Sequence, residues 1–518
     1  MPRRPSRFRT LFDATSPAVW VLLVIAILST LYIWQRPARR YDGLLFWTFA
    51  RPHTLAYNPL VAAWNKNHSS ATGVNLLLLD YGALERRMLS GFLSGTPVAD
   101  VIEVERNIAA RAFTGPIDDV GFTDLTDRLR TEGLLDKINL PSFSPWTSRG
   151  RIFGLPHDVH PVLLAYRADL VEAAGIDMSR VETWDDLIRT LKPLMVDLDG
   201  DGRPDRFILN FWPTNANVIE ALILQAGGHL FDENDRPVLD SEINVRVLTT
   251  MATWTAGSTR IAVDAPEFSA AGNQLRLQGT VIASVMPDWL SGVWKIDLPG
   301  LAGKIKVIPL PAWERGGRRT SVIGGSMLGI PKTSRDTETC WAFAKELYLS
   351  PELAAKNYRA LSIITPVKSL WSLPVFDEPD PYFSGQPVGR LFINQAPHVP
   401  TRSSSPYSTL ATARLTDAML ALTAHIESTG ETDIEKLLPE TRRLLAFAQE
   451  QVVKQIDRNV FLRPSENSAQ VERLVPKTLP EPPSSAPAQT GALGTTRPTP
   501  SSAFVTSEPA STPAVFHL

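Results

Sequence analysis

The segment from Gly150 to Lys192 constrains the fold of this chain more than any other stretch. It opens with an apolar run that ends at Pro156, continues through the polar residues 157–161, and then contains the uninterrupted apolar run 162–166. Residues that precede proline avoid the helical region, so the polar stretch is predicted to be extended. A continuous apolar run of this length is typical of a strand covered on both faces. The order predicts a strand, a polar crossing and a buried strand.

Two helices are predicted next. The first covers residues 167–174, with Gly175 placed to cap its C-terminus. The second begins after Thr183, which is followed three residues later by Asp186, the spacing of a capping box. Pro193 ends this helix, because proline lacks a backbone donor and clashes with the preceding turn.

Three phrases, GRIFGLP, LLAYRADLVEAAGID and TWDDL, occur in this segment in that order. They resemble the extracellular solute-binding protein family of ABC importers, and most closely its sugar- and oligosaccharide-binding branch. The resemblance extends from about Tyr41 to about Val460. It implies a two-lobed, periplasmic-binding-protein-like fold of type II, in which this segment crosses the hinge from the first lobe to the second.

The rest of the chain also predicts an α/β fold with more than one lobe. Its 518 residues exceed what one hydrophobic core usually supports. Alternating apolar strands and helices indicate doubly wound parallel sheets. The resemblance implies that later segments return to the first lobe. We expect lobe one to comprise residues 41–156 and about 320–375, and lobe two to comprise residues 157–319 and about 376–460.

Both ends of the chain differ from the globular part. Residues 1–40 are predicted to contain a cytoplasmic, arginine-containing end and an uncleaved transmembrane helix at about 17–34, since this apolar run has the length of a bilayer span. A cleavable signal peptide is the alternative, although the bulky residues 32–35 stand where its cleavage site requires small ones. Residues 461–518 are rich in Pro, Ser, Thr and Ala and are predicted to be disordered.

The sequence DLDGDGRPD resembles the beginning of a calcium-binding loop. Carboxylates at positions 1, 3, 5 and 9, with glycine at position 6, suit a hard divalent cation, and position 7 offers a backbone carbonyl. The glutamate that completes an EF-hand at position 12 is absent. The alternative is an acidic surface turn held by side-chain-to-backbone hydrogen bonds. The predicted ligands of a structural calcium ion are Asp197, Asp199, Asp201, Arg203 and Asp205.

Candidate sugar-binding residues follow the predicted strands. A sugar offers an apolar ring face to aromatic side chains and hydroxyl groups to carboxylates, and an open α/β sheet binds ligands beyond the carboxyl ends of its strands. For each tryptophan the alternative is a role in the core. The residues predicted to bind ligand are Trp47, Asp80, Asp158, Trp212, Asp288, Trp289, Trp294 and Gly325. For Trp47, Asp288 and Trp289 the family resemblance also implies a position at the cleft, and for Gly325 the resemblance alone implies it.

The crossing segment also contains two histidines, His157 and His160. On an extended chain, residues three apart point to opposite faces, so joint metal ligation is not expected. These residues are predicted to line the hinge with polar groups.

The resemblance implies a function in transport rather than catalysis. The predicted role is the substrate-binding component of an ABC importer, which captures a sugar or oligosaccharide and delivers it to membrane permease subunits on the periplasmic or extracellular side of the cell membrane. Motifs for nucleophilic, phosphate or zinc chemistry are absent from the sequence, no organic cofactor is expected, and a net charge of −2 gives no reason to propose nucleic acid. A membrane-anchored carbohydrate sensor and a carbohydrate-active enzyme are the alternatives.

Overall fold

The computed structural model describes residues 16–35 and 42–461, and two five-stranded mixed sheets organise the second of these ranges. The first sheet has the order β2-β1-β3-β12-β6. Strands β2, β1 and β3 are parallel, whereas β12 is antiparallel to both β3 and β6. Its strands are β1 (Leu44–Thr48), β2 (Val74–Leu78), β3 (Val101–Glu105), β6 (Leu155–Pro156) and β12 (Ser326–Gly329).

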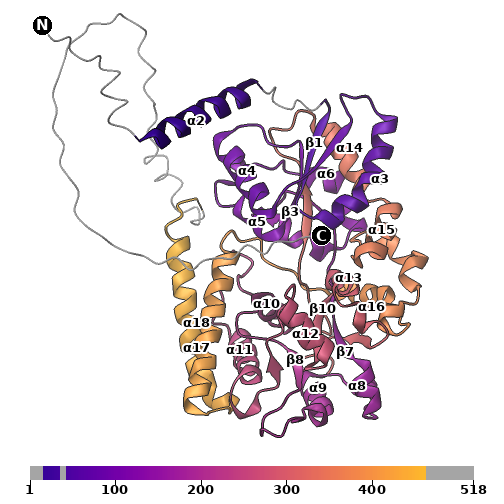
Figure 1. The fold of residues 1–518 in the computed structure, drawn as a ribbon, viewed down its shortest axis with the longest axis vertical. Helices are drawn as coiled ribbons and strands as arrows, with labels where there is room; N and C mark the ends of the chain where they lie inside the picture. The colour runs from indigo at the N-terminus through magenta and orange to yellow at the C-terminus, as the bar shows by residue number, and fades with distance from the viewer. Residues whose placement is uncertain (1–15, 36–41, 462–518) are drawn as a thin grey trace, which may run out of the picture. The chain divides into compact units, whose positions relative to one another are not determined.

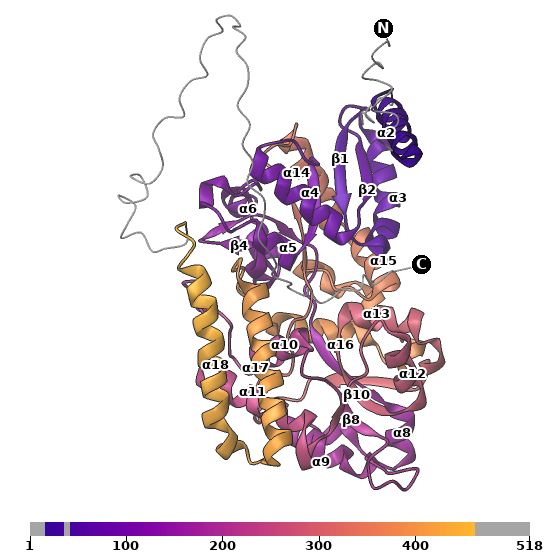
Figure 2. The same ribbon diagram turned by 60° about the vertical axis from the view of Figure 1, so that its left-hand side comes forward.

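The second sheet has the order β11-β7-β10-β8-β9. Strand β10 is parallel to β8 and antiparallel to β7, which in turn is antiparallel to β11. Its strands are β7 (Val162–Arg167), β8 (Phe207–Asn210), β9 (Ala262–Val263), β10 (Val281–Pro287) and β11 (Ile305–Pro309). Figures 1 and 2 show the two sheets well separated, one in the upper half and one in the lower half of each view.

The predicted α/β architecture with two linked sheets is confirmed, but the expectation of wholly parallel sheets is wrong. Strand β7 enters the second sheet directly from the first, and β12 enters the first sheet from the second. Each begins beside the carboxyl end of a parallel strand, because Val162 pairs with Pro287 and Ser326 pairs with Glu105. A strand that starts at that edge must run antiparallel to its neighbour.

Helices cover both sheets and enclose separate hydrophobic cores. Helices α17 and α18 pair with each other and pack against α11 beside the second sheet. The helices that follow strands of the first sheet or return to it are α3 (Arg51–Asn67), α4 (Tyr81–Ser94), α5 (Arg106–Arg111), α6 (Thr126–Thr131), α7 (Leu134–Lys137), α14 (Thr337–Tyr348) and α15 (Pro351–Leu361). The others in residues 162–456 are α8 (Ala168–Ala173), α9 (Trp184–Leu191), α10 (Ala216–Gln225), α11 (Glu242–Thr255), α12 (Ala270–Gln278), α13 (Asp288–Asp297), α16 (Val388–Gln395), α17 (Ser408–Thr429) and α18 (Ile434–Ile456).

The structure contains one of the local features predicted for residues 150–192 and changes another. The capping box of α9 is present, with the Thr183 hydroxyl accepting from the Asp186 N–H and the Asp186 carboxylate accepting from the Thr183 N–H. The single strand predicted before Pro156 is instead divided into β5 (Arg151–Ile152), which pairs with β4 (Thr147–Ser148), and β6. A side chain at Gly154, between β5 and β6, would collide with Met327 of the neighbouring β12, so the chain approaches that strand closely there.

The apolar run near the N-terminus forms helix α2 (Pro17–Gln35). Within residues 16–35 and 42–461, however, no helix combines the length and the apolar character that a membrane span requires. The structure therefore does not support the transmembrane helix predicted at 17–34. The disordered tail predicted at 461–518 lies, apart from its first residue, outside the described residues.

Candidate functional site

The carboxyl ends of the parallel strands in the two sheets face each other. Arg106 opens helix α5 directly after β3, and Glu220 lies on α10, the helix that follows β8. The two guanidinium NH2 groups donate to the two Glu220 oxygens at 3.2 and 2.5 Å, and the side chains are only 9% and 10% exposed. This ion pair joins the edges at which open α/β sheets bind their ligands.

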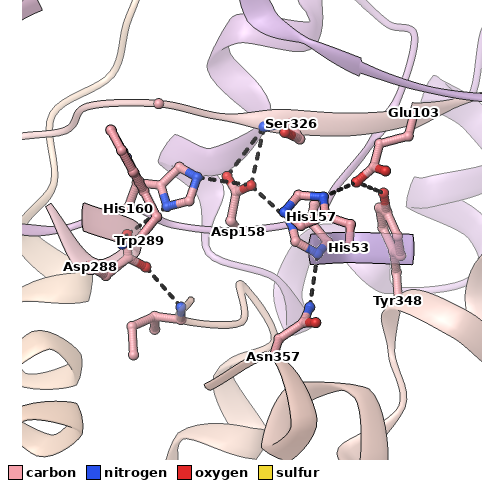
Figure 3. Close-up of polar contacts among 12 residues, drawn as sticks. His53, Glu103, His157, Asp158, His160, Asp288, Trp289, Ser326, Tyr348 and Asn357 are labelled. Atoms are coloured by element: carbon pink, nitrogen blue, oxygen red, sulfur yellow. Dashed lines mark hydrogen bonds and ion pairs between the residues drawn. The ribbon is translucent and has the colours of Figure 1, made fainter. Parts of the chain in front are cut away.

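The crossing segment 157–161 carries a buried polar network (Figure 3). The Asp158 carboxylate accepts from His157 Nδ1 and His160 Nε2, each at 3.0 Å, and from the Ser326 N–H at 3.2 Å. His157 Nε2 accepts from the Asn357 amide at 2.9 Å. Asp158, a predicted ligand residue, thus ties the crossing segment to β12 of the first sheet.

His160 continues this network into the second sheet. Its Nδ1 donates to Asp288 at 2.6 Å, and Asp288 also accepts from the N–H groups of Trp289 and Ile364 at 2.7 and 2.8 Å. The two histidines do not point to opposite faces as predicted, because His160 has a left-handed backbone (φ +57°) and turns toward the carboxylate that His157 also contacts. An extended chain cannot make this turn.

A second cluster surrounds Glu103 in β3. Its carboxylate accepts from His53 Nδ1 at 2.8 Å, Tyr57 at 2.7 Å, Tyr348 at 3.2 Å and the Thr48 hydroxyl. Burial opposes its charge, but His53 and these hydrogen bonds lower the pKa of Glu103 to about 2.

The same cluster has the composition of a metal site. Ligand atoms of His53, Glu103 and His157 lie within 4.8 Å of one another. Both ring nitrogens of His157 are already engaged by Asp158 and Asn357, and Glu103 has a full set of donors. The cluster is therefore a satisfied hydrogen-bonded network that fixes the base of the first sheet's carboxyl edge.

An aromatic pair lies at the carboxyl edge of the second sheet. Trp289 follows β10 and Phe268 lies in the loop after β9; their rings are parallel within 5° and their centroids are 6.2 Å apart. Phe268 is 49% exposed, Trp289 is half-buried, and the Trp289 indole donates to the Ile323 carbonyl at 2.9 Å. Phe268 also adopts a left-handed backbone (φ +58°), a rare conformation for a bulky residue that is frequent at functional sites.

Glu267 fixes the loop that presents Phe268. Its carboxylate pairs with Arg276 at 2.5 Å and accepts from Trp294 at 3.2 Å and from Asn210 at 3.1 Å. Burial raises the pKa of Glu267. Trp294, predicted to bind ligand, is 4% exposed and supports this carboxylate by donating a hydrogen bond to it.

The remaining predicted ligand residues are spread over both edges. Trp47 is 8% exposed at the end of β1, and its indole N–H has no acceptor among the described residues. Asp80 is exposed and accepts from the Ala83 N–H as the N-cap of α4. Trp212 is half-buried after β8. Gly325 (φ +132°) borders a small cavity that is also lined by Asp158 and by the buried Arg402.

The acidic loop lies away from these edges and is held by its own backbone. Asp197 accepts from the N–H groups of Gly200 and Gly202, and Asp205 accepts from Leu198, at 2.6 to 2.8 Å. The two backbone donors lower the pKa of Asp197. Carboxylate oxygens of Asp197, Asp199 and Asp205 lie within 4.8 Å of one another, as a cation would require. The calcium site, with Asp201 and Arg203 as its other ligands, stays a prediction.

Residues 51–352, more than half of the chain, match the family described as bacterial extracellular solute-binding protein. The chain belongs to this family. Two arabinooligosaccharide-binding proteins are similar to this solute-binding protein. That of Bacillus subtilis is 26% identical over 369 residues, which are 70% of this chain and 83% of the relative. That of Halalkalibacterium halodurans is 24% identical over 379 residues, or 70% and 81% of the two chains.

The fold agrees with this assignment. The sugar-binding protein MalE from Xanthomonas citri superposes with a TM-score of 0.64 at 17% identity, covering 82% of this chain and all of that one. At this identity the likeness concerns the fold alone.

Several site residues of this solute-binding protein escaped the sequence analysis. Arg106 directly follows β3, a position that could have marked it, but Glu220 lies within α10, and nothing in the sequence pairs the two residues. The backbone of Phe268 has no local signal, since neither glycine nor asparagine stands there. Arg402 comes from a distant loop and reaches Gly324 only in the folded chain.

Proposed function

We propose that this solute-binding protein captures a sugar or oligosaccharide between the facing carboxyl edges of its two sheets and delivers it to the transmembrane subunits of an ABC importer. The observation that carries the proposal is the parallel pair of Trp289 and half-exposed Phe268 beside an edge rich in carboxylates. Flat aromatic faces cover the C–H side of a sugar ring, and fixed carboxylates accept hydrogen bonds from its hydroxyl groups.

The relatives support the same ligand class, since two of them are named for arabinooligosaccharides. The extracellular designation of the family supports a location on the periplasmic or extracellular side of the cell membrane. The chemistry is reversible binding: when the edges close, water leaves the site and the polar contacts strengthen.

Ligand-induced thermal stabilisation tests this function. The purified protein is heated with a panel of mono- and oligosaccharides that includes arabinotriose and maltotriose, and with amino acids as the contrasting class. A saccharide present at 100 times its Kd is expected to stabilise the protein by about 2.7 kcal/mol. Stabilisation by amino acids alone contradicts the carbohydrate assignment, and release of a cleaved product from an oligosaccharide contradicts a binding role.

Two substitutions connect the function to the aromatic pair. Trp289→Ala and Phe268→Ala are each expected to remove most of the saccharide-induced shift, because each deletes a stacking face. Phe447→Ala is the matched control, since this phenylalanine is 60% exposed on α18, away from the facing edges. An unchanged shift in both site variants excludes the pair from the binding site.

A further inference from the structure

We propose that His160 is a positioning residue for ligand binding: clamped between Asp158 and Asp288, it holds the crossing segment and the Trp289 backbone in the arrangement that the binding site uses. This inference rests on the proposed function and concerns the same site. His160 itself is buried, so it acts through its neighbours rather than by touching the ligand.

His160 connects the two sheets through the contacts of its two ring nitrogens. His160 Nε2 contacts Asp158 at 3.0 Å, and Asp158 accepts from the Ser326 N–H in the first sheet. His160 Nδ1 donates to Asp288 at 2.6 Å on the side of the second sheet. Asp288 in turn fixes the amides of Trp289, which carries the aromatic face, and of Ile364, which follows α15. One imidazole thus joins the crossing segment to three other stretches of chain at the hinge (Figure 3).

The space around the His160 ring is also tightly filled. A side chain at Gly324 (φ +105°) would lie 2.8 Å from His160 Cδ2 and 2.9 Å from Trp289 Nε1. His160 and Trp289 therefore pack closely against the Gly324 backbone between the two sheets, and a larger residue at 324 would have to displace them. The left-handed backbone of His160 is the strained conformation that brings its ring into this spot.

The His160 ring also lies between two carboxylates, those of Asp158 and Asp288. Each ring nitrogen faces a carboxylate, so both are protonated in this geometry. Burial alone would favour the neutral ring, but Asp158 and Asp288 raise the pKa of His160 to about 10. The other charged or titratable groups around this cluster are His157 on the same segment, Tyr348 and Arg402, which both interact with Asp158, and Arg106, Glu220 and Glu105, which surround Arg402. With both carboxylates present, the clamp keeps its charge throughout the physiological pH range.

The first experiment removes one of the two carboxylates, so that His160 titrates within an accessible pH range. Asp288→Asn removes one carboxylate with little change of shape, so His160 is expected to lose its proton between pH 6 and 9. The dissociation constant for arabinotriose, measured by calorimetry on the full chain, is expected to rise about tenfold over this range in the variant and to stay constant in the wild type. Asp100→Asn, which alters a buried carboxylate elsewhere in the first sheet, is the control and is expected to show no pH dependence.

A ligand-free measurement separates this inference from the proposed function. In wild-type protein the amide protons of Trp289, Ile364 and Ser326 are expected to exchange slowly with solvent. His160→Gln is expected to speed their exchange at least tenfold, while amides in the core of α11 stay protected and show that the variant is folded. If wild type binds no saccharide, the proposed function fails and these amides alone decide the clamp. Unchanged exchange in His160→Gln, or a pH-independent affinity in Asp288→Asn, overturns the inference.

Discussion

At the scale of single residues, Arg106 and Glu220 form a buried ion pair between the two sheets. Arg402 lies nearby, and burial together with Arg106 lowers the pKa of Arg402 to about 9. Glu220 is the carboxylate that hydrogen-bonds to Arg106, while Glu105 lies 3.9 Å from Arg106 and, with Asp158, also acts on Arg402. Removing one partner of such a pair strongly destabilises a protein, because an unpaired buried charge costs more free energy than the intact pair contributes.

Glu220→Met is expected to lower the free energy of unfolding by about 3–5 kcal/mol, since it leaves the buried Arg106 with only the Glu105 carboxylate, 3.9 Å away. The double variant Arg106→Met with Glu220→Met is expected to lose less than Arg106→Met or Glu220→Met alone. Urea unfolding of the four proteins in this cycle measures the coupling. Glu435→Ala, in the exposed pair with Arg246, is the control and should leave the midpoint unchanged. Additive losses in the cycle contradict a strong interaction between the two side chains.

At the scale of elements, the strands and helices were predictable where one local signal determines them. The apolar run 162–166 became β7, buried along its whole length, and the capping box placed the start of α9. Strand direction was not predictable, because it depends on the edge from which β7 and β12 enter their sheets. Asp158 and Asp288 were predicted as site residues. Their shared partner His160 was not, because it reaches both carboxylates only through a left-handed backbone conformation that no local sequence pattern indicates.

The capping box of α9 gives a direct test of a predicted element. Thr183→Ala removes the acceptor for the Asp186 N–H and is expected to lower the free energy of unfolding by about 1 kcal/mol. Thr183→Ser keeps the hydroxyl and should recover most of the loss. Thr250→Ala, which alters a half-buried threonine within α11, provides the control in the same urea titration. A loss that serine does not recover would assign the effect to the methyl group rather than to the cap.

The acidic loop 197–205 allows two outcomes that differ in their response to calcium. Its carboxylates already accept several backbone N–H groups, which a surface turn alone explains. The clustered oxygens of Asp197, Asp199 and Asp205 lead us to expect that millimolar calcium raises the melting temperature and that a chelator reverses the effect. Asp199→Asn should abolish the response. A melting temperature that neither calcium nor chelator changes would leave the turn as the full account of this loop.

At the scale of the whole molecule, the buried hinge network determines how stability depends on pH. Glu103 has a pKa of about 2 when folded, so its contribution is complete above the unfolded value of about 4.3 and declines as the pH falls toward 2. The contribution of His160 to stability changes with pH in the opposite direction. With a folded pKa of about 10, its contribution is complete below the unfolded value of about 6.5 and is lost as the pH rises toward 10.

These two groups together predict maximal stability between about pH 4.5 and 6.5 and a decline on the alkaline side of at most about 1.4 kcal/mol per pH unit from His160. The free energy of unfolding, measured by urea titration at pH 5, 7 and 9, is expected to fall across this series in the wild-type protein. His160→Gln should be less stable at pH 5 and should lose most of the alkaline slope, because its side chain does not titrate. Asp100→Asn should keep that slope. An equal slope in wild type and His160→Gln would mean that the hinge histidine carries no extra proton in the folded protein, and the charge clamp between the two sheets would not exist.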